Sequence, residues 1–191
     1  WPDPANTPTV GLLMGGYTTS GAVNTVDKII FESQSNATDF GDLSTENYIA
    51  SGFSSDTRAL IAGGYKYTGG ETALNTIEYF TFSSAGNATD FGDLSATAYE
   101  SHGLSNNVRG VIALGYNNDT TGIVNTLEYV TIPTTGNSID FGDLTVARRN
   151  SSTVGSSTRG VFMTGAAVSP SNVMDYITIA STGNATDFGD T

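Results

Sequence analysis

The sequence lacks cysteine and carries little positive charge, and both features narrow the class of protein. With no Cys among 191 residues, a disulfide framework, a thiolate zinc site and a cysteine nucleophile are excluded. Lys and Arg number 7 against 19 Asp and Glu, a formal net charge of −12, which disfavours binding to nucleic acid or anionic lipid. No apolar run approaches the roughly 20 residues that span a bilayer. We therefore expect no nucleic-acid partner and no membrane insertion.

What the sequence does have is an internal repeat. The string Asp-Phe-Gly-Asp occurs four times, at intervals of 51, 50 and 47 residues. A second string keeps the same step, as Asn24-Thr25-Val26-Asp27, Asn75-Thr76-Ile77-Glu78, Asn125-Thr126-Leu127-Glu128 and Asn172-Val173-Met174-Asp175. Fixed periods of 20–50 residues are typical of solenoids and propellers. We expect one repeat domain over residues 1–191, with units at about 9–58, 59–109, 110–159 and 160–191, the first and last incomplete.

Each repeat favours short antiparallel strands over helices. No segment sustains a 3.6-residue apolar period, whereas β-prone runs lie between Gly, Asn, Ser and Thr clusters. Strands are expected at residues 60–65, 76–82, 91–94 and 99–104. The run 76–82 is apolar on both faces, so its sheet should be packed between two neighbours. About four short strands per 50 residues predict an all-β fold of propeller blades.

These residues resemble kelch repeats. The resemblance rests on Arg148 or Arg149 after Leu144, the pair Gly63-Gly64, Tyr79 and Phe91. Phe91 stands where the kelch pattern usually has Trp, and the glycine pair becomes Leu114-Gly115 and Thr164-Gly165 in later repeats. The resemblance implies an all-β, kelch-like β-propeller, or a propeller segment, of four repeats of about 50 residues.

Two longer strings resemble repeats in large virion and tail-fibre proteins of marine bacteriophages. They are Thr158-Arg159-Gly160-Val161-Phe162 and Gly86-Asn87-Ala88-Thr89-Asp90-Phe91-Gly92-Asp93-Leu94. This resemblance implies a structural or adhesive role in a phage virion or another extracellular assembly. The partners expected from it are other copies of the chain or other virion proteins.

The acidic strings have two interpretations. Asn and Asp side chains bond nearby backbone groups and favour turns, so a capped turn is the first. The second is a weak calcium site, because calcium takes six to eight oxygen ligands, roughly, in flexible geometry. No other cofactor is expected. The candidate metal ligands are Asp39, Asp42, Asp90, Asp93, Asp140, Asp143, Asp187 and Asp190.

One arginine per repeat, at Arg58, Arg109 and Arg159, suggests a structural ion pair with a carboxylate of the same or the next blade. An anion site is the alternative for these three residues. Equivalent residues spread around a ring would form a symmetric collar rather than a catalytic cluster.

The loops after the glycine pairs differ between repeats and are the candidate binding face, because variable loops of a repeat protein lie on one side. Their tyrosines, if exposed together, would indicate a glycan-binding module for host-surface recognition. The candidates are Tyr17, Tyr65, Lys66, Tyr67, Glu71, Tyr116, Asn117 and Asp119.

Catalysis is not expected. His102 is the sole histidine and no nucleophile elbow accompanies it. A carbohydrate-active enzyme would need two carboxylates set apart from the repeat, and Glu46, Glu71, Glu100 and Asp119 form no readable pair.

The ends of the chain bear on ring closure. The first residue is Trp1 rather than Met, and residues 1–8 include three prolines, so we expect a processed product or fragment and no whole outer strand there. Either four blades close with an irregular seam, or their edges pair with another chain.

Overall fold

The computed structural model describes residues 9–67, 69–167 and 169–191. It confirms an all-β fold built from antiparallel sheets. The expectation that residues 1–8 form no outer strand lies outside the described residues. Within the described ranges, no helix is long and apolar enough to cross a membrane.

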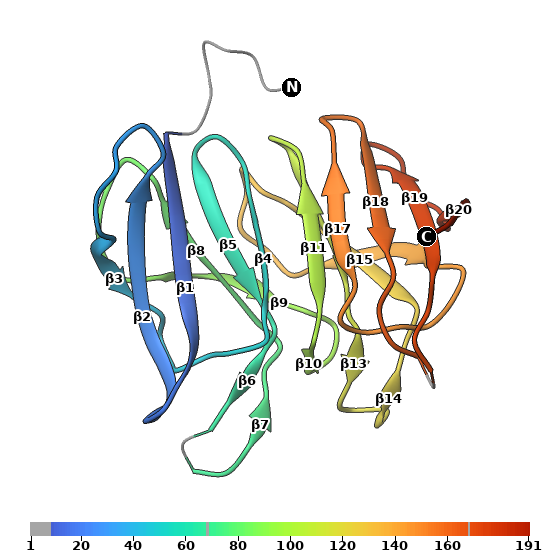
Figure 1. The fold of residues 1–191 in the computed structure, drawn as a ribbon, viewed down its shortest axis with the longest axis horizontal. Coiled ribbons are helices and arrows are strands. Elements are labelled where there is room, and N and C mark those ends of the chain that lie inside the picture. The colour runs from blue at the N-terminus through green and yellow to red at the C-terminus, as the bar shows by residue number, and fades with distance from the viewer. Residues whose placement is uncertain (1–8, 68, 168) are drawn as a thin grey trace.

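Four main sheets follow one another along the chain (Figure 1). Sheet 1 consists of β1 (Val10–Thr18), β2 (Gly21–Ile30) and β3 (Thr38–Asp42). Sheet 2 consists of β4 (Ser51–Ser54), β5 (Arg58–Ala62), β8 (Thr76–Thr81) and β9 (Thr89–Asp93). Sheet 3 consists of β11 (His102–Ser105), β12 (Arg109–Ala113), β15 (Thr126–Thr131) and β16 (Ile139–Asp143). Sheet 4 consists of β17 (Ser152–Gly155), β18 (Arg159–Met163), β19 (Val173–Thr178) and β20 (Thr186–Asp190).

Two small sheets lie below the main ones in Figure 1. One pairs β6 (Tyr65–Lys66) with β7 (Thr72–Ala73). The other holds β10 (Ala98–Tyr99), β13 (Tyr116–Asn117) and β14 (Gly122–Ile123). They carry the loops that vary between repeats, so the variable residues gather at one edge of the molecule.

The main sheets stand in a row, with sheet 1 and sheet 4 at opposite ends (Figure 1). The first strands of three sheets, β4, β11 and β17, lie side by side in the middle. Sheet 1 begins instead with β1, whose Gly-Gly-Tyr sequence matches residues 63–65, which directly follow β5. Sheet 1 is therefore a three-stranded version of the other three.

The core lies between neighbouring sheets. Three clusters of buried apolar residues join sheet 1 to sheet 2, sheet 2 to sheet 3 and sheet 3 to sheet 4. Phe40, Phe91 and Phe141 of the repeated acidic strings are each at most 4% exposed. Full burial of such a side chain contributes about 1.5–3 kcal/mol. This arrangement explains why β8 is apolar on both faces, since it packs against a sheet on either side.

The Asp-Phe-Gly-Asp strings form strands rather than turns. They lie in β3, β9, β16 and β20, and the Gly-Asn pairs, Ser35-Asn36 in sheet 1, lie in the hairpin loops that precede these strands. The glycine in each string has a positive φ, for example 146° at Gly92, and lies at a register shift opposite Ile77 and Glu78. A glycine at a bulge lets another backbone approach closely, and a Cβ on Gly92 would lie 2.5 Å from the carbonyl oxygen of Gly136 in the next sheet.

Candidate functional site

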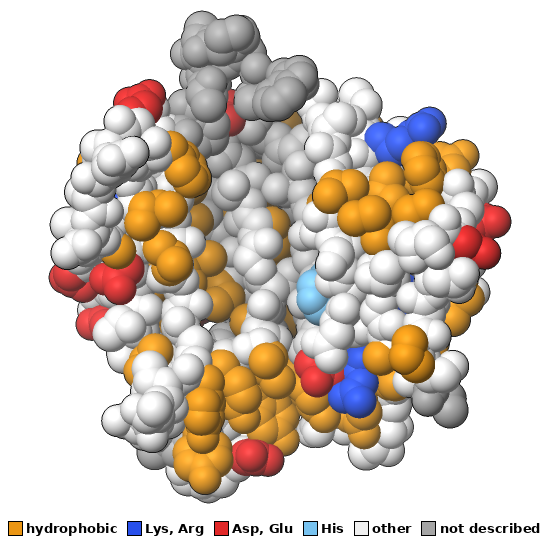
Figure 2. Space-filling model, viewed as in Figure 1, with side chains coloured by type: hydrophobic (Ala, Val, Ile, Leu, Met, Phe, Trp, Pro, Cys, Tyr) orange, Lys and Arg blue, Asp and Glu red, His pale blue; other side chains and the backbone are white. Residues whose placement is uncertain are grey.

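A row of tyrosine rings runs along the variable edge from sheet 1 toward sheet 3. Centroid distances between successive rings are 5.2 Å for Tyr17–Tyr48, 5.8 Å for Tyr48–Tyr65, 4.8 Å for Tyr65–Tyr99 and 4.9 Å for Tyr99–Tyr116. Figure 2 shows hydrophobic side chains, a class that includes Tyr, gathered at the lower edge over β6 and β7. The spacing is that of attractive aromatic pairs, so the rings form one continuous surface.

Glycines place these tyrosines at the edge. After β5, Gly63 and Gly64 have φ of 63° and 103°, which redirects the chain out of sheet 2 and into β6. A Cβ on Gly63 would lie 2.6 Å from the carbonyl oxygen of Ala98, so this turn has no room for a side chain. The amide of Gly64 donates to that carbonyl at 2.8 Å. Tyr65 follows this turn directly. Every repeat that keeps the glycine motif therefore places its own tyrosine at the same position.

The row has an exposed end and a more buried middle. Tyr17 is 58% exposed and Tyr67, whose ring lies 6.2 Å from it, is 49% exposed. Burial raises the pKa of Tyr48, and the nearby Glu71 carboxylate raises it further. Burial and the neighbouring Tyr116 raise the pKa of Tyr99. The phenols of Tyr48 and Tyr99 therefore keep their protons at neutral pH and remain hydrogen-bond donors beside an aromatic surface.

The structure brings several predicted loop residues together and adds two. Tyr17, Tyr65, Tyr67 and Tyr116 all belong to the row, where Tyr17 and Tyr67 are exposed and Tyr65 and Tyr116 are half-buried. Tyr48 and Tyr99 were missed, although both follow the repeated Leu43 and Leu94 by five residues, a shared position that could have indicated them. These two rings connect the others into one surface.

The remaining loop candidates lie around the row. The backbone amide of Tyr67 donates to Glu46 at 2.8 Å, so this carboxylate fixes the exposed end of the row. Lys66 lies in β6, and Glu71 is close enough to Tyr48 to raise its pKa. At the other end, Asn117 accepts from the amides of Asp119 and Thr120. Asn117 therefore caps its own turn.

Asp119 holds the segment before β10. Its carboxylate accepts from the amide of Thr97 at 3.1 Å and from the Thr97 hydroxyl at 2.6 Å. The next residues, Ala98 and Tyr99, form β10. Asp119 thus positions Tyr99 and has a structural task within the site.

The acidic strings act between sheets rather than within one turn. The backbone amide of Asp93 donates to the Asn137 side chain of the next sheet at 3.0 Å. The amides of Asp42 and Asp143 make the same bond, to Asn87 and Asn184. Each cap therefore comes from the following repeat, which differs from the predicted capping within a turn. Among the described residues, no three His, Cys, Asp or Glu side chains form a group that could hold a metal ion.

The repeated arginines have partners other than the predicted carboxylates. Arg58, Arg109 and Arg159 stack on Tyr79, Tyr129 and Tyr176 of their own sheets, with guanidinium carbons 4.2–4.5 Å from the ring centroids. Two of them also reach the next sheet.

Arg58 donates to the carbonyl of Ile132 at 2.8 Å, and Arg109 to that of Ile179 at 3.0 Å. The ion pairs within the described part of the chain lie elsewhere, at Arg148–Asp175 and Arg149–Glu100. Arg58 and Arg109 thus join neighbouring sheets through a ring and a carbonyl.

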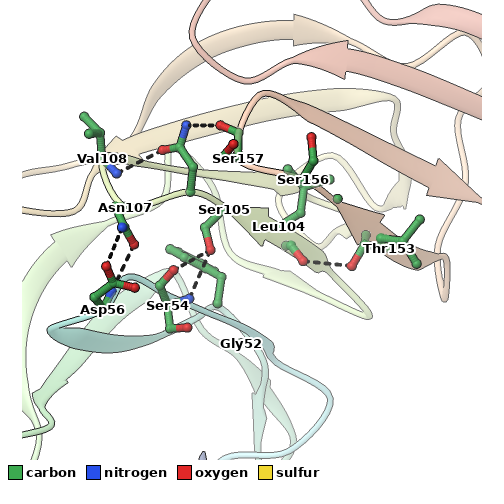
Figure 3. A pocket seen from close by; sticks show the side chains of 15 residues that line it. Gly52, Ser54, Asp56, Leu104, Ser105, Asn107, Val108, Thr153, Ser156 and Ser157 are labelled. Carbon is green, nitrogen blue, oxygen red and sulfur yellow. Dashed lines mark hydrogen bonds between the residues drawn. The ribbon is translucent and has the colours of Figure 1, made fainter. Parts of the chain in front are cut away.

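A hollow of about 650 Å³ lies between β4, β11, β17 and the turns that follow them, and none of its lining residues belongs to the tyrosine row (Figure 3). Hydrogen bonds between residues 51 positions apart in the sequence hold its lining together. The Ser105 side chain donates to the carbonyl of Ser54 at 2.6 Å, and the Asn106 side chain donates to the carbonyl of Ser157 at 2.9 Å. Of the fifteen residues that line it, Asp56 is the one with a charged side chain, and it bonds Asn107. Its lining therefore offers no second carboxylate for acid–base chemistry, and the tyrosine row is the stronger candidate site.

A scan against the models of known protein families and a search of curated proteins both find no match to this chain.

Proposed function

We propose that this chain is a non-enzymatic structural and adhesive scaffold, a kelch-like propeller or propeller segment, in a phage virion or another extracellular assembly. The observation that supports the scaffold is a contact that recurs between each pair of neighbouring sheets. In each contact a Gly-Asn hairpin docks on the preceding Asp-Phe-Gly-Asp strand. A rigid array of this kind holds the variable edge in one geometry.

The adhesive part of the proposal rests on the tyrosine row. Tyrosine supplies large contact area at low conformational-entropy cost and a polar tip for hydrogen bonding. The apolar C–H faces of a sugar ring can lie against such rings while its hydroxyls bond the phenols and nearby Glu46 and Glu71. A glycan-binding module for host-surface recognition is the second candidate function, and this row favours it.

The decisive experiment is a titration of the chain with a panel of neutral and acidic oligosaccharides, followed by NMR of the tyrosine rings. Binding should shift the resonances of the row and weaken at least tenfold in Tyr17→Ala and Tyr67→Ala. Both residues are about half exposed, so the fold should tolerate their removal. The matched control is Ile139→Ala, since Ile139 is 59% exposed but lies in β16, away from the row.

The outcomes separate the candidates. Shifts confined to the row, with no sugar product released, support adhesion without catalysis. Shifts centred on the hollow between β4, β11 and β17, or release of a shortened sugar, would contradict it. If no sugar in the panel binds, the adhesive part fails and the structural role stands alone.

A further inference from the structure

The two ends of the row of sheets carry opposite halves of the contact that recurs inside the molecule. Each internal contact has a forward half, the Asp-Phe-Gly-Asp strand of one sheet, and a backward half, the Gly-Asn hairpin and apolar strand face of the next. Sheet 4 has a forward half with no sheet after it among the described residues. Sheet 1 has a backward half, with Ser35-Asn36 in place of the Gly-Asn pair, and no sheet before it among those residues.

The forward half at sheet 4 is exposed at positions that are buried elsewhere. Phe188 is 51% exposed, whereas its equivalents in the other three sheets are at most 4% exposed. A Cβ on Gly189 would meet nothing within 4 Å, whereas one on Gly41 would collide with the carbonyl oxygen of Gly86. The backbone at Gly189 still has the bulged geometry, with φ of 125° and a register shift opposite Met174 and Asp175. Its shape is thus that of a contact without its partner.

Arg159 completes the forward half. It stacks on Tyr176 with the same geometry as the other repeated arginines, 4.5 Å from the ring centroid. Arg58 and Arg109 are half-buried, and each donates to a carbonyl of the next sheet. Arg159 is exposed. The residue equivalent to Ile132 and Ile179 in sheet 1 is Phe31, so a docked sheet 1 would offer the Phe31 carbonyl to Arg159.

The backward half at sheet 1 is equally open. Leu13 is 53% exposed, while its equivalent in sheet 2, Ile61, is 5% exposed and packs in the cluster with Phe40. Asp27 is exposed, although its equivalents Glu78, Glu128 and Asp175 are at most 6% exposed.

Each of those three carboxylates accepts a hydrogen bond from a backbone amide of the preceding sheet. The donor lies two positions after the acidic string of that sheet, and the three donors are Ser44, Ser95 and Thr145. Asn36, the equivalent of the capping residues Asn87, Asn137 and Asn184, is also exposed. Sheet 1 therefore presents an apolar face with an acceptor and a cap, each matching a group that a forward half provides.

We propose that sheet 4 of one molecule docks on sheet 1 of a second copy of this chain, in the register of the internal contacts. Phe188 lies against Leu13 and Ile29 of the partner, because Ile29 is the equivalent of Phe80, whose ring contacts Phe40 at 5.9 Å. The backbone amide of Asp190 donates to the side chain of Asn36 of the partner. The interface is head-to-tail, so it generates a ring or a filament rather than a dimer of like faces.

The test is sedimentation of the 191-residue chain over a concentration series, with one variant per face. Leu13→Asp places a charge in the backward half, and Phe188→Asp in the forward half. Both side chains are about half exposed in the single molecule, so the monomer should remain folded, which circular dichroism and urea unfolding check. Ile139→Asp is the matched control, since Ile139 is 59% exposed and its equivalents in the other repeats are Thr38, Thr89 and Thr186.

The wild type and Ile139→Asp should exceed the monomer mass of 19.8 kDa, and each face variant alone should sediment as a monomer. An equal mixture of Leu13→Asp and Phe188→Asp should give particles of twice the monomer mass, because one intact pair of faces remains. A monomeric wild type at 100 µM, roughly, or a mixture that stays monomeric, would overturn the proposal. Association abolished by one variant but not by the other would also overturn it, as would a loss in the Ile139→Asp control. Sugar binding by the tyrosine row is measured separately, so the two proposals can fail independently.

Discussion

The contact between sheets 2 and 3 and the contact between sheets 3 and 4 use the same backbone frame with different chemistry. In the first, the buried Glu128 accepts from the amide and hydroxyl of Ser95 and from the hydroxyl of Ser138. In the second, Asp175 stands at the equivalent position, accepts from Thr145, and pairs with the guanidinium of Arg148 at 2.8 Å. Both charged groups of that pair are fully buried.

One residue accounts for the difference. It lies four positions after the leucine that ends each Asp-Phe-Gly-Asp-Leu segment. It is Ala98 at the contact of sheets 2 and 3, and Arg148 at the contact of sheets 3 and 4. A small apolar residue leaves the carboxylate to hydroxyl and amide donors, whereas an arginine there brings a charge that only a carboxylate can balance. Nε and Nη1 of Arg148 make no hydrogen bond with the described residues. The same backbone arrangement thus accommodates either set of side chains. The stability of the contact with the Arg148–Asp175 ion pair depends more strongly on both partners being present.

The largest effect should come from breaking the buried pair. Arg148→Ala leaves the Asp175 carboxylate buried with hydroxyl and amide donors alone, and should lower the free energy of unfolding by about 3–5 kcal/mol. Glu128→Gln, at the equivalent carboxylate, keeps an acceptor for Ser95 and should cost only about 1–2 kcal/mol. Urea unfolding of both variants checks the contrast.

The double variant Arg148→Ala with Asp175→Ala separates charge from packing. Removing both charges should restore part of the stability lost in the single variant. A cost for Arg148→Ala no larger than that for Glu128→Gln would show that the two contacts are energetically alike, and that the buried charge adds no dependence on its partner.

A smaller effect is expected from filling the close approach between sheets. Gly92→Ala combines a positive φ with a Cβ only 2.5 Å from the Gly136 backbone, and should cost about 2–4 kcal/mol. Gly189→Ala has the same kind of strain with open space beyond it, and should cost about 1–2 kcal/mol. Thermal unfolding in dilute solution compares them. Equal losses would mean that the neighbouring sheet adds nothing to the requirement for glycine.

Much of this architecture could be predicted from the sequence because the repeat fixes which residues are equivalent. The predicted strands 60–65 and 76–82 overlap β5 and β8, since their apolar patterns survive in every copy. The partner of Arg58 could not be predicted, because Ile132 lies 74 residues away and offers a carbonyl that every residue has. The tyrosine row was found only in part, because Tyr48 and Tyr99 lie outside the loops that vary.

The smallest effect should be a pH dependence from the sole histidine. Burial lowers the pKa of His102, while the Glu100 carboxylate and a hydrogen bond with the Glu100 backbone partly oppose this. The unfolded chain therefore binds the proton more readily, with a pKa near 6.5. Stability from this group is complete above pH 6.5, roughly, and falls as the pH drops below it, by at most about 1.4 kcal/mol per pH unit.

Comparing the wild type with His102→Gln between pH 5 and 8 isolates this contribution from that of the carboxylates. The wild type should lose more stability on acidification than the variant. Parallel pH profiles would show that His102 titrates alike in the folded and unfolded chain.

Amide hydrogen exchange of the dilute, monomeric chain tests most directly whether neighbouring sheets are joined by the hairpin-to-strand contact and whether the two ends lack it. The amides of Gly86, Gly136 and Gly183 donate to carbonyls of the preceding sheet at 2.7–2.9 Å, whereas the equivalent Ser35 in sheet 1 has no preceding sheet among the described residues. We predict slow exchange at the three glycines and fast exchange at Ser35. Fast exchange at the glycines, or protection at Ser35 equal to theirs, would contradict this mode of assembly.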